Sequence, residues 1–128
     1  MKIEHLAIWA EDIELLRRFY TEHFGMKCGD KYINPKKGFT SYFLSFGEDK
    51  TRIELMHVPQ MESPASRGNL KGLAHFAFSV GSKDAVNAMT EKLRSNGYTI
   101  LSEPRTTGDG CYESAVADPE GNYVEISE

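Results

Sequence analysis

The two halves of the chain carry the same pattern of residues in the same order. His5-Leu6-Ala7-Ile8 returns as His75-Phe76-Ala77-Phe78, and Ile53-Glu54-Leu55 returns as Val124-Glu125-Ile126. Self-similarity of this kind indicates a fold built from repeated structural units. The sequence therefore predicts one domain over residues 1–128, with repeat one at about 1–58, a linker at 59–71 and repeat two at about 72–128.

Each repeat shows the same succession of predicted elements, namely one strand, one helix and three further strands. Asp12 is a residue type that begins helices and Gly25 one that ends them, which predicts the first helix between them. The second helix is predicted to begin at Ser82 or Asp84 and to end at Asn96. The predicted strands cover residues 3–9, 27–33, 39–46, 51–58, 73–80, 98–102, 111–117 and 123–127. This β-α-β-β-β order, written twice, predicts an α+β fold with helices on the outer face of a curled mixed sheet.

Composition excludes several classes of protein. The chain has 128 residues and a formal net charge of −4, without a basic block, which argues against a nucleic-acid partner. No apolar run approaches the roughly 20 residues of a membrane span, and the N-terminus becomes acidic too early for a signal peptide. Cys28 and Cys111 form no paired motif and fit free thiols in a reducing compartment. We therefore expect a small, cytoplasmic globular protein.

Strand alternation separates an apolar face from a face that carries histidine and glutamate. On the first predicted strand His5 points away from Leu6, and on the fourth strand Glu54 points away from its apolar neighbours. The second repeat places His75 and Glu125 in the same way. Two imidazoles and two carboxylates suit a divalent ion such as Zn, Ni, Co, Mn or Fe. The alternative is a solvated sheet face, where both residue types are ordinary.

The pattern resembles the vicinal oxygen chelate superfamily, which includes glyoxalase I, methylmalonyl-CoA epimerase, extradiol dioxygenases and bleomycin-resistance proteins. The resemblance covers essentially the whole chain and is carried by Ile3–Ile8, Gly72–Phe78 and Asp118–Ile126. It implies paired βαβββ units around a metal cleft, a small-molecule substrate and a homodimer.

The resemblance also implies that His5, Glu54, His75 and Glu125 are the ligands of one divalent metal ion. This ligand set is most similar to that of glyoxalase I. The implied activity is that of a lyase or isomerase, with proton transfer through a metal-stabilised enediolate on a small oxygenated metabolite. Glu125 is the first candidate for the base and Glu54 the second. The linker permits the ligands to come from one chain or from two chains of a dimer.

Two positions depart from glyoxalase I. Trp9 stands where that enzyme has an arginine and Val58 where it has an asparagine, and both of those residues help to hold glutathione. The sequence therefore predicts an enzyme that is not specific for glutathione. Arg52 and Arg105 are candidates for binding an anionic substrate group, with solvated surface charge as the alternative. Trp9 and Tyr123 are candidates for an aromatic pocket wall, with rim packing as the alternative.

A second function remains compatible with the sequence, namely a metal-free protein of the bleomycin-resistance type that sequesters its ligand. Trp9 and Tyr123 suit an aromatic ligand, but proteins of that type generally lack the four metal-ligand residues. An extradiol dioxygenase is less compatible, because those enzymes typically use two histidines and one glutamate, which leaves Glu54 as an extra carboxylate.

Overall fold

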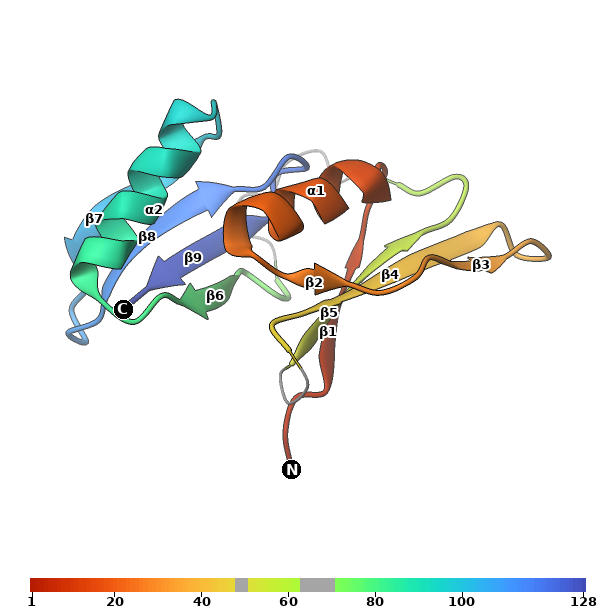
Figure 1. Cartoon of the computed structure of the whole chain (residues 1–128), viewed down its shortest axis with the longest axis horizontal. Coiled ribbons are helices and arrows are strands. Elements are labelled where there is room, and N and C mark those ends of the chain that lie inside the picture. Colours follow the sequence, from red (N-terminus) through yellow and green to blue (C-terminus); the bar gives the residue numbers. More distant parts are fainter. Residues whose placement is uncertain (48–50, 63–70) are drawn as a thin grey trace. The chain divides into compact units, whose positions relative to one another are not determined.

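The computed structural model describes residues 1–47, 51–62 and 71–128 and divides into two compact units, Met1–Ser63 and Pro64–Glu128 (Figure 1). Within the described residues there are two helices and nine strands. Much of the predicted linker at 59–71 lies outside the described residues.

The first unit is one mixed sheet with a helix on one face. The strand order is β1-β5-β4-β2, with β3 paired to β4, and β1 runs parallel to β5. Helix α1 packs on β4 and β5 (Figure 1). Its apolar stripe, which includes Leu16 and Phe19, is buried together with Leu44, Ile53 and Leu55 of the sheet. The elements are β1 (His5–Trp9), α1 (Ile13–Phe24), β2 (Lys27–Cys28), β3 (Tyr32–Asn34), β4 (Phe39–Ser45) and β5 (Arg52–His57).

The second unit repeats this topology. Its strand order is β6-β9-β8-β7, β6 runs parallel to β9, and α2 packs on β7, β8 and β9 (Figure 1). Val86 and Leu93 of the helix are buried with Val116, Val124 and Ile126 of the sheet. The elements are β6 (Phe76–Ser79), α2 (Lys83–Ser95), β7 (Ile100–Thr106), β8 (Tyr112–Ala117) and β9 (Tyr123–Ser127). The α+β class and the twofold βαβββ order are thus confirmed.

The helix ends follow the predicted capping residues. The carboxylate of Asp12 accepts hydrogen bonds from the backbone N–H groups of Glu14 and Leu15, at 3.0 and 2.9 Å. Gly25 ends α1 with φ of 71°, in the left-handed region that glycine adopts without a steric penalty. Of the two candidates for the start of α2, Ser82 is the cap.

Several strand predictions were wrong in detail. The segment 27–33 forms two short strands, β2 and β3, because Gly29 and Asp30 interrupt it with residues that favour turns. β7 starts later than predicted and continues through Pro104, which an edge strand with register shifts accommodates. β1 and β6 begin later than predicted, at His5 and Phe76.

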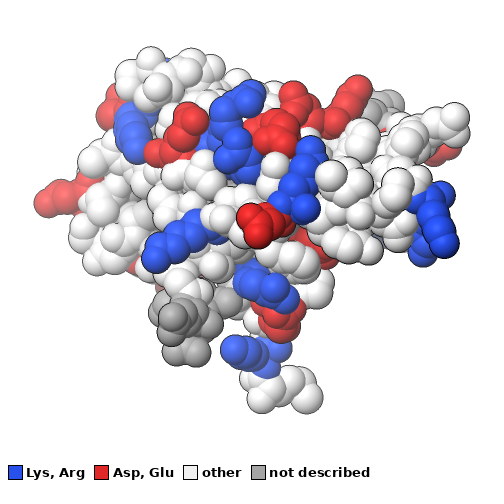
Figure 2. All heavy atoms as spheres, turned by 45° about the vertical axis from the view of Figure 1, so that its right-hand side comes forward, with Lys and Arg blue, Asp and Glu red and all other residues white. Residues whose placement is uncertain are grey.

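Neither helix in the described part of the chain is long and apolar enough to cross a membrane. On the face that Figure 2 shows, basic and acidic side chains are intermixed.

A charged cluster ties α1 to β4 in the first unit. The Glu14 carboxylate accepts hydrogen bonds from Arg17 Nε at 2.9 Å, Tyr42 Oη at 2.8 Å and Lys31 Nζ at 3.1 Å. The Arg17 and Lys31 cations also lie 5.6 and 5.5 Å from the centroid of the Tyr42 ring. The hydrogen bond from Arg17, followed by that from Tyr42, lowers the pKa of Glu14 to about 2.

This cluster predicts a pH-dependent contribution to stability. A lowered pKa means that ionised Glu14 stabilises the fold above pH 4.5, its ordinary pKa, and that this contribution disappears as the pH falls through about 2. Because the side chain is 38% exposed and solvent screens the interactions, we expect Glu14→Gln to lower the free energy of unfolding at pH 7 by about 1 kcal/mol. Urea unfolding at pH 7 and near pH 2 measures the difference.

The matched control is Glu91→Gln. It removes another i,i+3 ion pair with an arginine, Arg94, and the Glu91 side chain is more exposed than that of Glu14. Its effect on the free energy of unfolding should be smaller than that of Glu14→Gln at pH 7. A Glu14→Gln effect that is equal at the two pH values would contradict the assignment.

Candidate functional site

His5 and Glu54 lie on the face of the first sheet opposite α1. In the parallel pairing of β1 with β5, Ala7 is the partner of Glu54, and His5 lies two residues before Ala7 on the same face. The Nε2 atom of His5 is 3.8 Å from Oε2 of Glu54, whose side chain is 15% exposed. The neighbours of Glu54 on β5, Ile53 and Leu55, are buried against the helix. The same alternation that builds the core therefore directs both polar groups to the opposite face.

The second unit brings His75 and Glu125 together in the same register. In the parallel pairing of β6 with β9, Ala77 is the partner of Glu125, and His75 lies two residues before Ala77. The Nε2 atom of His75 is 3.2 Å from Oε2 of Glu125, whose side chain is 17% exposed. Each unit therefore carries one His–Glu pair, built by an identical parallel strand pairing.

A tight turn sets the start of β9 and so the position of Glu125. The buried Asp118 carboxylate accepts hydrogen bonds from the backbone N–H groups of Glu120 and Asn122, at 3.0 and 2.8 Å, and from the Asn122 side-chain amide at 2.7 Å. Gly121 adopts a φ of 81° in this turn. The Asp118–Asn122 segment thus forms the turn that its composition indicates.

Glu125 lies in a partly desolvated and charged environment. Burial raises its pKa, the His75 ring opposes this, and the negative charge of Glu113 raises it again. Glu113 shares the face of Glu125, since Ala115, two residues further along β8, is the partner of Glu125. The strand register thus fixes the face of Glu113. Arg105 lies 3.7 Å from Glu113 and donates a hydrogen bond to Ser102 at 2.7 Å.

The His5–Glu54 pair has charged and aromatic neighbours, of which the sequence indicated Arg52 but not Glu4 or Phe43. The Glu4 carboxylate contacts Nδ1 of His5 through one oxygen and Nη2 of Arg52 through the other. The Arg52 guanidinium lies 4.0 Å from the centroid of the Phe43 ring, and that ring is edge-on to His5 at 5.6 Å. The sequence did contain a signal for the role of Glu4, because Glu4 directly precedes His5. Histidines that bind a metal ion commonly form a hydrogen bond to a second carboxylate.

Aromatic side chains occupy the same face at the far end of β1. Trp9 is 53% exposed and edge-on to Phe39, with 6.4 Å between the ring centroids, and Tyr32 lies 6.1 Å from Phe39. In the second unit the Tyr123 ring lies 6.3 Å from His75.

Each pair supplies one imidazole and one carboxylate, which are donor types that Zn and neighbouring transition metals accept. Within the ranges 1–47, 51–62 and 71–128, no group of three or more His, Cys, Asp and Glu side chains is assembled as a metal site. The donor chemistry of each pair fits a divalent ion, and each pair alone provides only part of a coordination shell.

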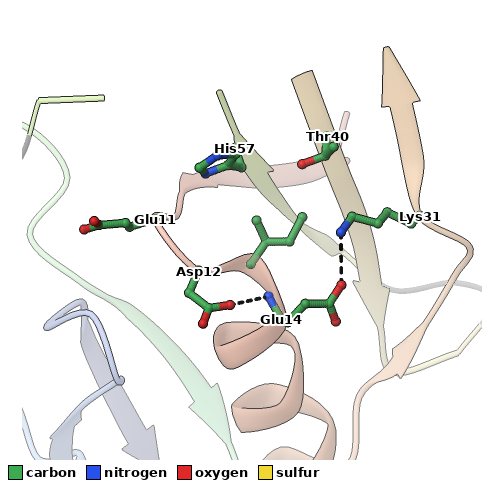
Figure 3. Close-up of a pocket in the computed structure, with 7 residues that line it drawn as sticks. Glu11, Asp12, Glu14, Lys31, Thr40 and His57 are labelled. Atoms are coloured by element: carbon green, nitrogen blue, oxygen red, sulfur yellow. Dashed lines mark hydrogen bonds and ion pairs between the residues drawn. The ribbon is translucent and has the colours of Figure 1, made fainter. Parts of the chain in front are cut away.

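A hollow of about 320 Å³ lies at the start of α1 in the first unit, and neither His5 nor Glu54 lines it (Figure 3). The side chain of His57 lies at this hollow, and its Nδ1 atom is 3.0 Å from the carbonyl oxygen of Ala10. None of the candidate site residues predicted from the sequence lines it. Its lining residues are Glu11, Asp12, Ile13, Glu14, Lys31, Thr40 and His57.

Comparison with known proteins establishes the family. The family model described as "Glyoxalase/Bleomycin resistance protein/Dioxygenase superfamily" matches residues 2–126, so this chain belongs to that superfamily. The chain is 28% identical to a lactoylglutathione lyase of Arabidopsis thaliana, over 95% of this chain and 42% of that protein. It is 30% identical to the mitochondrial methylmalonyl-CoA epimerase of Bos taurus, over 84% of this chain and 61% of that protein.

Solved structures agree with this assignment. The trypanothione-dependent glyoxalase I of Leishmania major matches with a TM-score of 0.79 and 26% identity, covering 100% of this chain and 86% of that chain. The chain spans 42% of the length of the plant relatives, lactoylglutathione lyases by name. The superfamily resemblance predicted from the sequence is thus confirmed, and its named relatives include lyases and an epimerase.

The Asp118 turn predicts a specific stability effect. Asp118→Ala removes a buried acceptor of three hydrogen bonds and leaves backbone N–H groups without this partner, so we expect it to lower the free energy of unfolding by about 2 kcal/mol. Asp109→Ala is the control, because Asp109 accepts a hydrogen bond from Thr107 in an exposed turn, and it should leave the urea midpoint close to that of wild type. Equal urea midpoints for the two variants would show that the turn does not depend on Asp118.

Proposed function

We propose that this chain is a divalent-metal-dependent lyase or isomerase of the glyoxalase type that acts on a small oxygenated metabolite and is not specific for glutathione. The observation that carries the proposal is the His–Glu pair that occurs twice, in identical strand register, within a fold of this superfamily. A solvated sheet face would not require the same two residue types at the same two register positions in both units.

The proposed metal ligands are His5, Glu54, His75 and Glu125. Two imidazole nitrogens and two carboxylate oxygens would complete most of the shell of Zn, Ni, Co, Mn or Fe, and solvent or substrate oxygen would fill the rest. An ion so held would supply Lewis-acid chemistry for polarising a substrate carbonyl. The four ligands are proposed to act together on one ion, supplied by one chain or by two chains of a homodimer.

Glu125 is the proposed general base. A proton next to a carbonyl group needs a nearby carboxylate that can take it up and return it. Glu125 fits this role because its side chain is only 17% exposed and Glu113 places a second negative charge beside it, both of which favour the protonated form after transfer. Glu54 is the second candidate, on the corresponding position of the first unit.

The proposed substrate has an apolar part and an anionic part. The Trp9, Phe39 and Tyr32 rings form an aromatic surface on the His5 face that suits an apolar substituent. Tyr123, beside His75, is proposed to line the pocket as well. Arg52 and Arg105 are the proposed partners of a carboxylate or phosphate, since a guanidinium has several N–H donors and its contact with one carboxylate does not use all of them.

The proposal excludes a requirement for glutathione because the chain lacks the matching side chains. Trp9 and Val58 stand where glyoxalase I has an arginine and an asparagine that help to hold that cosubstrate. The proposed compartment is the cytoplasm, which the two free cysteines suit, and the proposed assembly is a homodimer.

The test is solvent-proton exchange on small α-hydroxycarbonyl compounds in D2O, followed by proton NMR after loading with each divalent metal, with and without glutathione. We expect exchange without glutathione, lost in His5→Ala and lowered at least ~100-fold in Glu125→Gln. His57→Gln is the control, because His57 lies at the hollow beside α1, and it should keep the wild-type rate.

Two outcomes would overturn this function. One is exchange that requires glutathione, which would indicate that the protein is a lactoylglutathione lyase. The other is a wild-type exchange rate in Glu125→Gln, which would remove the base from the mechanism.

A second candidate function is sequestration of an aromatic ligand without a metal, favoured by the half-exposed aromatic surface around Trp9. Trp9 is the sole tryptophan in the sequence, so its fluorescence reports ligand binding at this face. Saturable quenching by a planar aromatic compound in metal-free protein, together with no metal-dependent exchange, would favour this candidate over the enzyme.

A further inference from the structure

We propose that Glu4 is a positioning residue for His5. Its carboxylate holds the imidazole in the tautomer and orientation that present Nε2 as a metal ligand, and Arg52 holds Glu4 in place. This inference deepens the proposed function and rests on it, because it takes His5 to be a ligand.

Two carboxylates define the direction of the His5 ring. Its two nitrogens face two different carboxylates: Nδ1 contacts Glu4, and Nε2 lies 3.8 Å from Oε2 of Glu54. Glu4 is thus on the side of the ring away from Glu54. It cannot share with Glu54 the position that an ion would take beside Nε2.

The contact with Glu4 also determines the tautomer of His5. An ionised carboxylate only accepts hydrogen bonds, so a bond between Glu4 and Nδ1 requires the proton of the neutral ring to be on Nδ1. Nε2 then carries the lone pair and faces the carboxylate of Glu54. Two electron-pair donors that face each other in this way can bind one cation between them. The Glu4 contact therefore selects the state of His5 that binds a metal ion.

Arg52 holds Glu4 in position, although Glu4 is exposed and close to the N-terminus. Arg52 is the strand partner of His5 in the pairing of β1 with β5, and its guanidinium contacts the second oxygen of Glu4. The same guanidinium lies 4.0 Å from the centroid of the Phe43 ring, which is edge-on to His5. Glu4 and Phe43 thus both contact the imidazole, and Arg52 contacts both of them, so that the three side chains together limit the rotation of the ring.

The second unit lacks this arrangement, which makes the two histidines inequivalent. Ala74 precedes His75, where Glu4 precedes His5. Tyr123 occupies the position in the second unit that Arg52 occupies in the first. Arg52 directly precedes the strand partner of Leu6, and Tyr123 directly precedes the strand partner of Phe76. The His75 ring lies beside the Tyr123 ring at 6.3 Å, and His75 serves as an internal reference for any test on His5.

The experiment compares wild type, Glu4→Ala and Glu4→Gln. Two-bond proton–nitrogen NMR of the 15N-labelled, metal-free protein reads the tautomer of each histidine ring. We expect His5 to carry its proton on Nδ1 in wild type and to shift towards Nε2 protonation in Glu4→Ala, while His75 stays unchanged. Glu4→Gln keeps an amide oxygen that accepts from Nδ1, so it should restore most of the wild-type tautomer signature.

Metal affinity is the second readout, measured by titrating the same proteins with Zn²⁺ alone. Loss of a second carboxylate of this kind typically weakens binding by about 10–100-fold, and we expect Glu4→Ala to fall in that range. Glu103→Ala is the matched control, because Glu103 is an exposed carboxylate bound to an arginine, Arg94, at 2.6 Å. It should leave both the affinity and the His5 tautomer unchanged.

The outcomes separate this inference from the function on which it rests. If wild type binds Zn²⁺ and Glu4→Ala matches Glu103→Ala in affinity or keeps the wild-type His5 tautomer, the positioning role is wrong and the metal site stands. If wild type binds no Zn²⁺, the proposed metal site is wrong, and Glu4 has no ligand to position. A tautomer change together with weakened binding in Glu4→Ala, reversed in part by Glu4→Gln, establishes the role.

Discussion

The parallel pairing of the opening strand with the closing strand is the constraint on which both units depend. In each unit it brings together two segments that are distant in the sequence, and it aligns an alanine with a glutamate, Ala7 with Glu54 and Ala77 with Glu125. A slip of one residue would turn the polar groups towards the helix and the core residues away from it. The apolar core thus specifies the register, and the register in turn brings each histidine close to its glutamate.

Much of the fold could be predicted because the signals are local and repeated. Alternation along the strands, the Asp12 and Gly25 caps and the Asp118 turn each act within a few residues, and the structure contains all of them. Two errors concern residues that favour or tolerate a break in a strand. Gly29 and Asp30 favour a turn and divide the segment that was predicted as one strand, and Pro104 lies in an edge strand whose register shifts accommodate it.

The candidate site could be predicted only in part, because its surroundings depend on pairing between strands. Sequence alternation assigned His5 and Glu54 to one face, but it could not show that Glu4 contacts both His5 and Arg52, since that requires β1 to lie beside β5. The same is true of Glu113, whose face follows from the pairing of β8 with β9. The difference between the two repeats was the signal that was missed. The repeated histidines and glutamates build the two His–Glu pairs, and the residues that are not repeated make the surroundings of the two pairs chemically different.

The central claim is that residues of both units hold one divalent ion, and elemental analysis tests it most directly. The protein would be purified without chelator or affinity-tag metal, and wild type would be compared with His5→Ala and His75→Ala. The account predicts about one divalent ion per chain in wild type and loss of that ion in both variants. No ion in wild type after incubation with Zn, Ni, Co, Mn and Fe(II), or full metal content in either variant, would contradict it.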